Sequence, residues 1–295
     1  MPATVTLLIE PLPADASVDD LERTFREVDQ AEPALRVGEL STQRGDGIFE
    51  TIGVVDGHAQ EVRPHLERLR NSARICDLPE PNLVQWEAAI ATALARIPAT
   101  GEFGIKLVLS RGVEHGPAPT AWLAASPVAD QSGPREQGIR AVTLDRGYDR
   151  GAAERAPWLL LGAKTLSYAV NMAAIREAKR RGADDAVFVS ADGYVMEGPT
   201  SSVILRRGGV YSTPAPSGAI LHGTTQQSLF EHLAAIGGQV EYRDIPVADL
   251  RSADAAWLVS SVRLAAGITA LDDRPMPYDA AETAAFNAYL LTPRD

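Results

Sequence analysis

A polar stretch near the middle of the chain divides the sequence into two regions. Residues 128–137 read Val-Ala-Asp-Gln-Ser-Gly-Pro-Arg-Glu-Gln and offer little apolar surface for a core. The 295 residues are enough for two compact domains, because domains of about 100–150 residues are the commonest size. We therefore expect a small N-terminal domain over residues 1–127, a linker over residues 128–138 and a larger domain over residues 139–295.

Both regions mix helical and strand-like patterns of apolar residues. In the first region, strands are expected at 4–9, 47–55, 104–110 and 121–125, and helices at 18–28, 65–76 and 83–97. In the second region, we expect hairpins at 186–197 and 203–213, a helix at 226–236 and a buried strand at 255–260. Thr165 is a suitable N-cap for one more helix, which would end at Gly182. This mixture predicts an α/β protein.

The composition excludes several classes of partner. The net charge of -11 argues against a nucleic acid or an anionic membrane, because such surfaces attract clustered positive charge. The first twenty residues lack the order of a signal peptide, so we expect a cytoplasmic protein that acts on small molecules. The single cysteine, Cys76, can form neither an internal disulfide nor a multi-cysteine metal site, and we expect no metal.

The lysines narrow the search for amine chemistry, because the chain contains only three of them. Lys179 lies among arginines at an expected helix end, and Lys106 alternates with apolar residues in an expected strand. Lys164 follows the apolar segment Trp158-Leu-Leu-Leu-Gly-Ala163. A charged ammonium is costly to desolvate there, and its pKa would fall toward that of a reactive amine. Lys164 is therefore the candidate for amine chemistry.

Two further features supply what pyridoxal 5'-phosphate needs besides an amine: an acid for its ring nitrogen and donors for its phosphate. Glu197 follows the apolar residues Val195 and Met196, where a carboxylate would require a cationic partner such as a pyridinium. The sequence Gly223-Thr-Thr225 opens an expected helix, and the N-terminus of a helix favours a phosphate. Each signal is weak by itself, and the order of the three strengthens the interpretation.

This order resembles the class IV aminotransferase family, also called fold-type IV. The similarity lies in Gly162-Ala-Lys-Thr-Leu-Ser-Tyr168, Asp192-Gly-Tyr-Val-Met-Glu-Gly198 and Leu221-His-Gly-Thr-Thr225. It extends to Gly45-Asp-Gly-Ile-Phe-Glu50 and His65-Leu-Glu-Arg-Leu69, and so covers nearly the whole chain from about Arg44 onward. Branched-chain aminotransferases, D-amino acid transaminases, (R)-amine transaminases and aminodeoxychorismate lyases share this pattern.

The resemblance implies a two-domain α/β fold of the D-amino acid aminotransferase type, a homodimer, and pyridoxal 5'-phosphate as the cofactor. Lys164 would form the Schiff base and act as general acid and base, and Glu197 would face the pyridine nitrogen. The phosphate would be bound by Arg68, Thr224, Thr225 and Ser261. Tyr168 either bonds the ring oxygen of the cofactor or is a half-buried helix aromatic, and the sequence leaves both interpretations open.

The substrate must be inferred from residues at the rim of the pocket. Arg44 precedes the Gly-Asp-Gly turn and is placed to bind a substrate carboxylate, unless it is simply a surface arginine. The pair Phe49-Glu50 is typical of aminotransferases in this family. The loop after Ser110-Arg-Gly112 lacks the arginine-X-histidine pair of well-known D-amino acid transaminases, which leaves (R)-amines open.

We therefore predict a transaminase that moves an amino group between a D-amino acid or (R)-primary amine and a 2-oxo acid such as pyruvate or 2-oxoglutarate. An aminodeoxychorismate lyase, which releases pyruvate and 4-aminobenzoate, is the alternative, because segments 162–171 and 197–202 also resemble such proteins. A branched-chain L-amino acid aminotransferase is a further alternative. In a non-catalytic protein with this fold, Lys164 would be only a lysine at the edge of the core.

Overall fold

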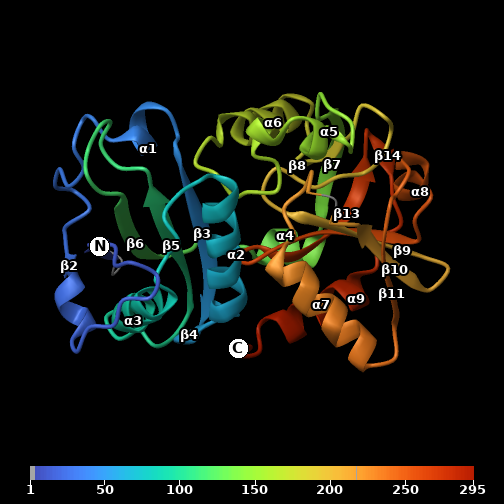
Figure 1. The fold of residues 1–295 in the computed structure, drawn as a ribbon. Coiled ribbons are helices and arrows are strands. Elements are labelled where there is room, and N and C mark those ends of the chain that lie inside the picture. Colours follow the sequence, from blue (N-terminus) through green and yellow to red (C-terminus); the bar gives the residue numbers. More distant parts are fainter. Residues whose placement is uncertain (1–3, 217) are drawn as a thin grey trace. The chain divides into compact units, whose positions relative to one another are not determined.

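The computed structural model describes residues 4–216 and 218–295 (Figure 1). By their contacts, these residues form two compact units. The first unit contains residues up to Ala129 together with Ala163–Tyr168 and Pro293–Asp295. The second contains Asp130–Gly162 and Ala169–Thr292. We describe each unit by itself.

The first unit is built on a six-stranded sheet with the strand order β2-β1-β6-β5-β3-β4. Its pairs are antiparallel, and the long pair β3 and β5 is in register from Gly47 opposite Ser110 to Val55 opposite Glu102. The strands are β1 (Val5–Ile9), β2 (Phe25–Glu27), β3 (Gly47–Val55), β4 (His58–Ala59), β5 (Glu102–Ser110) and β6 (Thr120–Pro127). The expected strands 47–55, 104–110 and 121–125 therefore belong to one sheet.

Two long helices cover strands of this sheet. Helix α2 (Val62–Ile75) packs on β3, beside which it runs in Figure 1, and α3 (Leu83–Leu94) packs on β1 and β6. Helix α3 begins at Asn82, whose side chain accepts a hydrogen bond from the Gln85 amide and so satisfies a free backbone donor. The unit also contains the short helices η1 (Leu21–Thr24) and α1 (Leu40–Gln43).

The segment Ala163–Tyr168 belongs to the first unit because it pairs with the start of β3. The Phe49 amide donates to the Lys164 carbonyl at 2.9 Å, and the Leu166 amide donates to the Gly47 carbonyl at 2.8 Å. These two bonds bracket a bridge between Ile48 and Thr165. Six residues are thus held beside β3 as a short strand-like addition.

The second unit contains an eight-stranded sheet with the order β11-β10-β9-β12-β13-β7-β8, and β14 pairs with β13. Five buried residues follow one another in β12, because both faces of this strand are covered. Ala256 and Leu258 enter one core, and Trp257 and Val259 enter the other. The strands are β7 (Ile139–Asp145), β8 (Asp185–Val189), β9 (Ser202–Arg207), β10 (Val210–Pro214), β11 (Gln239–Arg243), β12 (Ala255–Ser260), β13 (Leu264–Leu271) and β14 (Arg274–Pro275).

Helices of the second unit pack on this sheet. Helix α6 contacts β7 and β8, α7 contacts β9, β11 and β12, and α9 contacts β13. The helices are α4 (Ser132–Gln137), α5 (Ala152–Arg155), η2 (Pro157–Leu159), α6 (Ala169–Arg180), α7 (Thr224–Ala235), α8 (Val247–Arg251) and α9 (Ala280–Leu290). Most of the stretch that we expected to be a linker is therefore helical, as α4.

Two local expectations are wrong. The expected helix 18–28 is the short helix η1 followed by β2, because Phe25 to Glu27 pair with β1. The expected N-cap Thr165 is paired with Ile48, and helix α6 begins only at Ala169. Both errors arise from pairing with distant strands, which overrides local helical spacing. None of the described helices has the length and apolar content that crossing a bilayer requires.

Candidate active site

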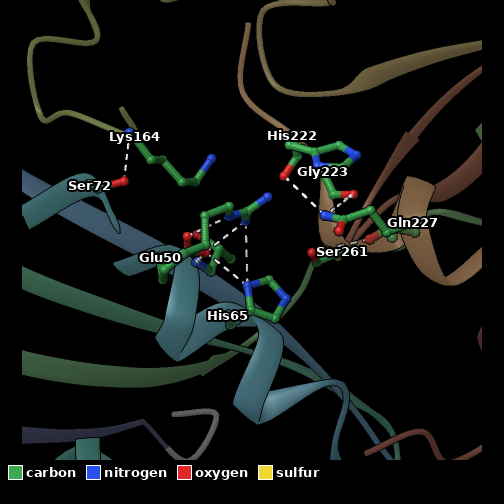
Figure 2. A network of polar contacts seen from close by, with 11 residues as sticks. Glu50, His65, Ser72, Lys164, His222, Gly223, Gln227 and Ser261 are labelled. Atoms are coloured by element: carbon green, nitrogen blue, oxygen red, sulfur yellow. Dashed lines mark hydrogen bonds and ion pairs between the residues drawn. The ribbon is translucent and has the colours of Figure 1, made fainter. Parts of the chain in front are cut away.

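Lys164 is held from both sides of its backbone in the first unit. Its amide donates to the Ser72 hydroxyl of α2 at 3.1 Å (Figure 2). Its carbonyl accepts from the Phe49 amide. The ammonium nitrogen lies 4.7 Å from the centre of the Phe49 ring and 5.9 Å from that of Tyr168. The two rings meet edge to face at 5.2 Å. The predicted residues Lys164, Phe49 and Tyr168 are thus brought together.

Helix α2 brings Arg68 to the same face as the contact with Lys164. Ser72 and Arg68 are four residues apart, so their side chains lie one above the other along the helix. Ser72 is fully buried, and the Arg68 side chain is only 12% exposed. One helix therefore positions both the backbone of Lys164 and the predicted phosphate-binding arginine.

The Arg68 guanidinium is fixed by a buried carboxylate on β3. Its Nε donates to Glu50 Oε1 at 2.7 Å, and its Nη2 donates to Glu50 Oε2 at 2.8 Å (Figure 2). His65 Nδ1 lies 2.8 Å from the same Oε2 atom, and both Glu50 and His65 are fully buried. Such a two-bond fork orients the guanidinium as well as holding it. We call Glu50, His65 and Arg68 the buried charge cluster.

The charges prevail over burial at Glu50 and Arg68, whereas burial prevails at His65. Burial works to raise the pKa of Glu50, but the charge of Arg68 and the hydrogen bonds from Arg68 and His65 hold that pKa well below its usual range. Burial works to lower the pKa of Arg68, and Glu50 raises it. Burial lowers the pKa of His65 more than Glu50 raises it. Glu50 and Arg68 are therefore both ionised at neutral pH, and His65 is neutral.

Lys106 is a neighbour of Phe49 that sequence reasoning assigned only to a strand. Its ammonium lies 5.1 Å from the centre of the Phe49 ring and 5.9 Å from that of Trp122, and burial lowers its pKa. The register pairs Lys106 with Thr51 on one side and Ala124 on the other. Phe49 and Trp122 are two residues from those partners and so share the face of Lys106. The sequence shows that Lys106 alternates with apolar residues. It does not show the register of β3 and β5, which places the Lys106 ammonium beside Phe49.

Arg44 lies at the end of α1, and its side chain is 67% exposed. Its nearest acidic partner among the described residues is Glu114, at 4.0 Å. An exposed ion pair of this length contributes about 0–1 kcal/mol. The structure therefore leaves Arg44 accessible to a ligand and does not join it to the cluster around Lys164.

In the second unit, the start of α7 provides the second group of predicted residues. Gly223 is the N-cap and has no side chain to cap the helix, and Thr224 and Thr225 are buried. The Thr225 hydroxyl lies 3.2 Å from that of Ser261, which directly follows β12. Figure 2 shows Ser261 near Gly223. A Cβ atom at residue 223 would meet the Ser202 hydroxyl, so a larger residue here would have to displace that side chain. Amides and hydroxyls converge at this end of α7.

The backbone of Glu197 is paired irregularly with Phe188 of β8. The Phe188 amide donates to the Glu197 carbonyl, whereas the Phe188 carbonyl accepts from the Met196 amide, so two residues face one. This is a β-bulge, which changes the direction of a side chain and is common beside active sites. The Glu197 carboxylate accepts a hydrogen bond from the Leu221 amide at 3.0 Å. That bond ties Glu197 to the segment that leads into α7.

These residues fit pyridoxal 5'-phosphate. A helix N-terminus capped by glycine, with two hydroxyls beside it, suits a phosphate dianion. A carboxylate suits a ring nitrogen that must stay protonated, and a lysine suits the cofactor's need for an amine. Among the described residues, no group of three His, Cys, Asp or Glu side chains could hold a metal ion.

Comparison with known proteins identifies the family. The model of the amino-transferase class IV family matches residues 47–271, which is most of the chain. This chain belongs to the class IV aminotransferases. Enzymes of this family use pyridoxal 5'-phosphate, which agrees with the fit of the residues described above.

Several relatives of this class IV enzyme are similar over most of their length. A bifunctional aminodeoxychorismate lyase / D-amino acid transaminase from Mycobacterium tuberculosis is 48% identical over 83% of this chain and 88% of its own. A fold IV-transaminase from Curtobacterium pusillum has a TM-score of 0.93 and 49% identity, and covers 98% of this chain and 99% of its own. The fold-type IV architecture expected from the sequence is thereby confirmed.

A third relative has been solved with ligands. A hypothetical aminotransferase from Mycobacterium tuberculosis, in its form bound to alpha-ketoglutarate and PMP, has a TM-score of 0.87 and 46% identity. The match covers 90% of this chain and 94% of the other. The PLP-bound form of the hypothetical aminotransferase from that organism also has a TM-score of 0.87, at 42% identity over 97% of both chains.

Proposed function

We propose that this enzyme moves an amino group between a D-amino acid or (R)-primary amine and a 2-oxo acid such as pyruvate or 2-oxoglutarate. The observation that carries the chemistry is the position of the Lys164 amine against the rings of Phe49 and Tyr168. The preference for D-amino acids is supported by the relative of 48% identity, whose name includes D-amino acid transaminase. The use of a 2-oxo acid is supported by the relative solved with alpha-ketoglutarate.

Lys164 acts on protons in this proposal. The bound cofactor withdraws electrons from the bonds of the substrate Cα atom. With the cofactor bound, Lys164 as a free amine would take the proton from the substrate Cα atom and return it to the cofactor carbon that carries the amino nitrogen. The hydrogen bonds from Phe49 and to Ser72 fix the Lys164 backbone, so that the motion is confined to the side chain. This confinement suits an amine that must reach two carbon atoms.

The remaining predicted residues hold the cofactor. We assign the ring nitrogen to Glu197 and the phosphate to Arg68, Thr224, Thr225 and Ser261. Glu50 supports this assignment of Arg68, because it uses Nε and Nη2 and leaves Arg68 in a fixed orientation. Tyr168 directly precedes α6 and packs on Phe49, which supports a role at the cofactor ring over that of a helix aromatic.

Two cations are candidates for the substrate carboxylate. Arg44 is exposed and only weakly paired, and Lys106 lies beside Phe49. We assign Phe49 to the wall of the substrate pocket, since its ring contacts both Lys164 and Lys106. A carboxylate that binds near Phe49 would therefore meet Lys106, and one at the rim would meet Arg44.

Aminodeoxychorismate lyase activity is the second candidate. It is supported by the name of the same relative and by Lys106, because aminodeoxychorismate carries two carboxylates and a second cation suits such a substrate. In the lyase, Lys164 would move the proton from the same type of carbon, and pyruvate would leave. The two activities can share one set of cofactor residues.

A half-reaction separates these possibilities. The purified holoenzyme is mixed separately with D-alanine, (R)-1-phenylethylamine, L-leucine and aminodeoxychorismate, and its visible absorption band is followed. Conversion by D-alanine or the (R)-amine is expected. Conversion by L-leucine alone would replace the proposal with a branched-chain aminotransferase. Release of pyruvate and 4-aminobenzoate without conversion by any amine would make the enzyme a lyase.

Lys164→Ala tests the role of Lys164, and Lys179→Ala is its control. Loss of a general acid and base lowers the rate by about 10²–10⁴-fold. Lys179→Ala removes a lysine from the last turn of α6 and is expected to leave the rate unchanged. Unreduced turnover of Lys164→Ala would refute the assignment, whichever substrate is used.

We also propose that the enzyme is a homodimer in the cytoplasm. The dimer is supported by apolar side chains that are exposed close to Lys164 in the sequence. Trp158 is 75% exposed and Val170 is 59% exposed. Leu159 and Met172 are also exposed. Analytical ultracentrifugation tests the assembly, and a monomer with full activity would contradict it.

A further inference from the structure

Glu39 is a buried carboxylate that none of the roles above explains. It is the N-cap of α1 and is only 1% exposed. Its two oxygens accept hydrogen bonds from the Ser110 hydroxyl, from the Thr120 hydroxyl at 2.7 Å and from the Ser41 amide at 3.4 Å. All three donors are neutral groups. Three segments of the first unit therefore meet at one carboxylate.

The hydrogen bonds keep this carboxylate ionised. Burial works to raise the pKa of Glu39, but the hydrogen bonds from Ser110, Thr120 and Ser41 together lower it below its usual value. Hydrogen bonds to an ionised acceptor are shorter and stronger than those between neutral groups. Glu39 is thus charged at neutral pH and holds its three donors firmly.

The two hydroxyl donors lie at opposite ends of one loop. Ser110 is the last residue of β5, and Thr120, which faces it in the sheet, is the first residue of β6. We call residues 111–119 between them the β5–β6 loop. The Ser110 hydroxyl also accepts a hydrogen bond from the Gly112 amide at 3.2 Å, which extends the network into this loop. Glu39 therefore binds the base of the loop on both sides.

The backbone around Glu39 is paired with the same loop. Glu39 and Val113 form an antiparallel bridge. The Leu40 amide donates to a carbonyl of the loop at 2.9 Å, and the Glu114 amide donates to the Gly38 carbonyl at 3.1 Å. The start of α1 and the β5–β6 loop are thus joined by backbone bonds as well as by the Glu39 side chain.

Helix α1 carries Arg44 at its other end. The helix has only four residues, and the Arg44 amide donates to the Leu40 carbonyl at 2.9 Å. One turn of helix has little stability of its own, so the position of α1 depends on its tertiary contacts. Arg44 and Glu114, its partner at 4.0 Å, extend from the two segments that Glu39 joins.

We propose that Glu39 is a positioning residue for Arg44, and that it holds α1 and the β5–β6 loop together so that the Arg44 guanidinium is oriented toward a substrate carboxylate. The inference rests on the proposed role of Arg44. A shift of about 1 Å in a group that positions the substrate can lower the rate about 100-fold. Because Glu39 acts through α1, its loss affects only substrates that carry a carboxylate.

The first readout is KM of the holoenzyme for D-alanine compared with (R)-1-phenylethylamine, which has no carboxylate. Glu39→Ala removes the acceptor, whereas Glu39→Gln keeps its shape and can accept one hydroxyl bond and donate another. Asn82→Ala is the matched control, because Asn82 is a buried N-cap of the same unit that also holds a distant segment. It caps α3 and donates to the carbonyls of Pro13 and Ala16.

The second readout is amide hydrogen exchange, which requires no turnover. The Leu40 and Glu114 amides form the bonds between α1 and the β5–β6 loop. Both should exchange about tenfold faster in Glu39→Ala, as expected when hydrogen bonds to a charged acceptor are lost. They should remain close to the wild-type rates in Glu39→Gln and in Asn82→Ala.

Glu39→Ala is expected to raise KM for D-alanine about tenfold and to leave KM for the amine within about twofold. Glu39→Gln should restore most of this difference, and Asn82→Ala should lose stability without changing either KM. An equal rise of KM for both substrates, or unchanged exchange of the two amides in Glu39→Ala, would overturn the inference. If Glu39→Ala does not fold, Thr120→Val removes one of the three hydrogen bonds and is judged by the same criteria.

Arg44→Ala separates this inference from the proposed function. If Arg44→Ala raises KM for D-alanine and Glu39→Ala does not, the role of Arg44 stands and the inference is wrong. If D-alanine is converted but neither variant raises its KM, the transaminase activity stands, and the role of Arg44 and the inference fail together.

Discussion

The two regions that we assign to the phosphate use opposite physical means. In the first unit, Arg68 carries a full charge and is bound by the buried carboxylate of Glu50. In the second unit, α7 begins at Gly223 and offers amides and the hydroxyls of Thr225 and Ser261. One region is charged and requires a permanent counter-ion, and the other is neutral.

This difference has consequences for stability. A buried ion pair loses hydration when the protein folds, and each member destabilises the folded state once its partner is removed. A helix N-terminus carries only partial charge, and its groups are less costly to leave without a ligand. We therefore expect mutations in the buried charge cluster to act on folding, and mutations at the start of α7 to act mainly on cofactor binding.

Glu50→Gln gives the largest expected change. Removal of one partner from a buried ion pair costs about 3–5 kcal/mol, because the remaining Arg68 charge is left uncompensated. Urea denaturation of the apoenzyme measures this loss. Glu114→Gln is the control, since Glu114 lies in an exposed pair with Arg44 and should change stability by less than about 1 kcal/mol. Equal losses of stability in Glu50→Gln and Glu114→Gln would show that the buried charge cluster contributes no more to folding than an exposed ion pair does.

Acidification should weaken the first unit through His65. The folded pKa of His65 lies below its unfolded value, so the unfolded chain binds the proton more readily and stability falls as the pH drops below about 6.5. The slope is at most about 1.4 kcal/mol per pH unit for one proton. Glu50, whose pKa is also lowered, loses its contribution only at more acidic pH.

The pH effect is measured from urea midpoints between pH 8 and pH 5. His65→Asn retains a side chain that can donate to Glu50 but does not titrate, so its midpoint should change less over this range. A wild-type slope that persists unchanged in His65→Asn would assign the proton uptake to another group.

Thr225→Val tests the neutral region. Loss of one hydrogen bond to a charged phosphate is worth about 1.5–3 kcal/mol, so cofactor affinity should fall about tenfold to 150-fold. The stability of the apoenzyme should change by less, because the hydroxyl is exchanged for a methyl group of the same shape. Isothermal titration with the cofactor and urea denaturation together give the two numbers. If Thr225→Val loses stability but keeps its affinity for the cofactor, the expectation that the start of α7 acts mainly on cofactor binding is wrong.

Arg44→Ala should have the smallest effect on stability, about 0–0.5 kcal/mol, because its ion pair with Glu114 is long and exposed. The informative measurement is KM for D-alanine compared with (R)-1-phenylethylamine, which has no carboxylate. A higher KM for the amino acid alone would assign the carboxylate to Arg44. If Lys106→Ala raises that KM and Arg44→Ala does not, the carboxylate belongs to Lys106.

Local sequence patterns predicted many of the helices and strands and the candidate lysine, but they did not predict which distant residues these contact. The alternation in 47–55 and the helical spacing in 65–76 are properties of short segments, and the structure contains β3 and α2 at these places. The apolar segment 158–163 marked Lys164, because a charged ammonium is costly to desolvate there. The family, its cofactor and its fold were implied by the resemblance of short segments to class IV aminotransferases, and they are confirmed by the comparisons.

Long-range pairing is what the sequence does not contain. The bond between Glu50 and Arg68 depends on α2 packing on β3, and the position of Lys106 beside Phe49 depends on the register of β3 and β5. The same is true of Thr165, whose pairing with Ile48 displaced the start of α6 to Ala169. Each of these contacts joins segments that look independent when they are read along the chain. The roles of the individual site residues stay predictions.

The pairing of residues 163–168 with β3 also affects the order in which the protein can fold during synthesis. The beginning of β3 acquires its neighbour only after Thr165 has been translated, although the rest of its sheet lies within the first 127 residues. The Glu61 amide acquires its partner later still, because it donates to the carbonyl of Arg294, which is translated after the whole second unit. N-terminal regions generally fold first on the ribosome. Here the region that is made first is completed only after Arg294 has been translated.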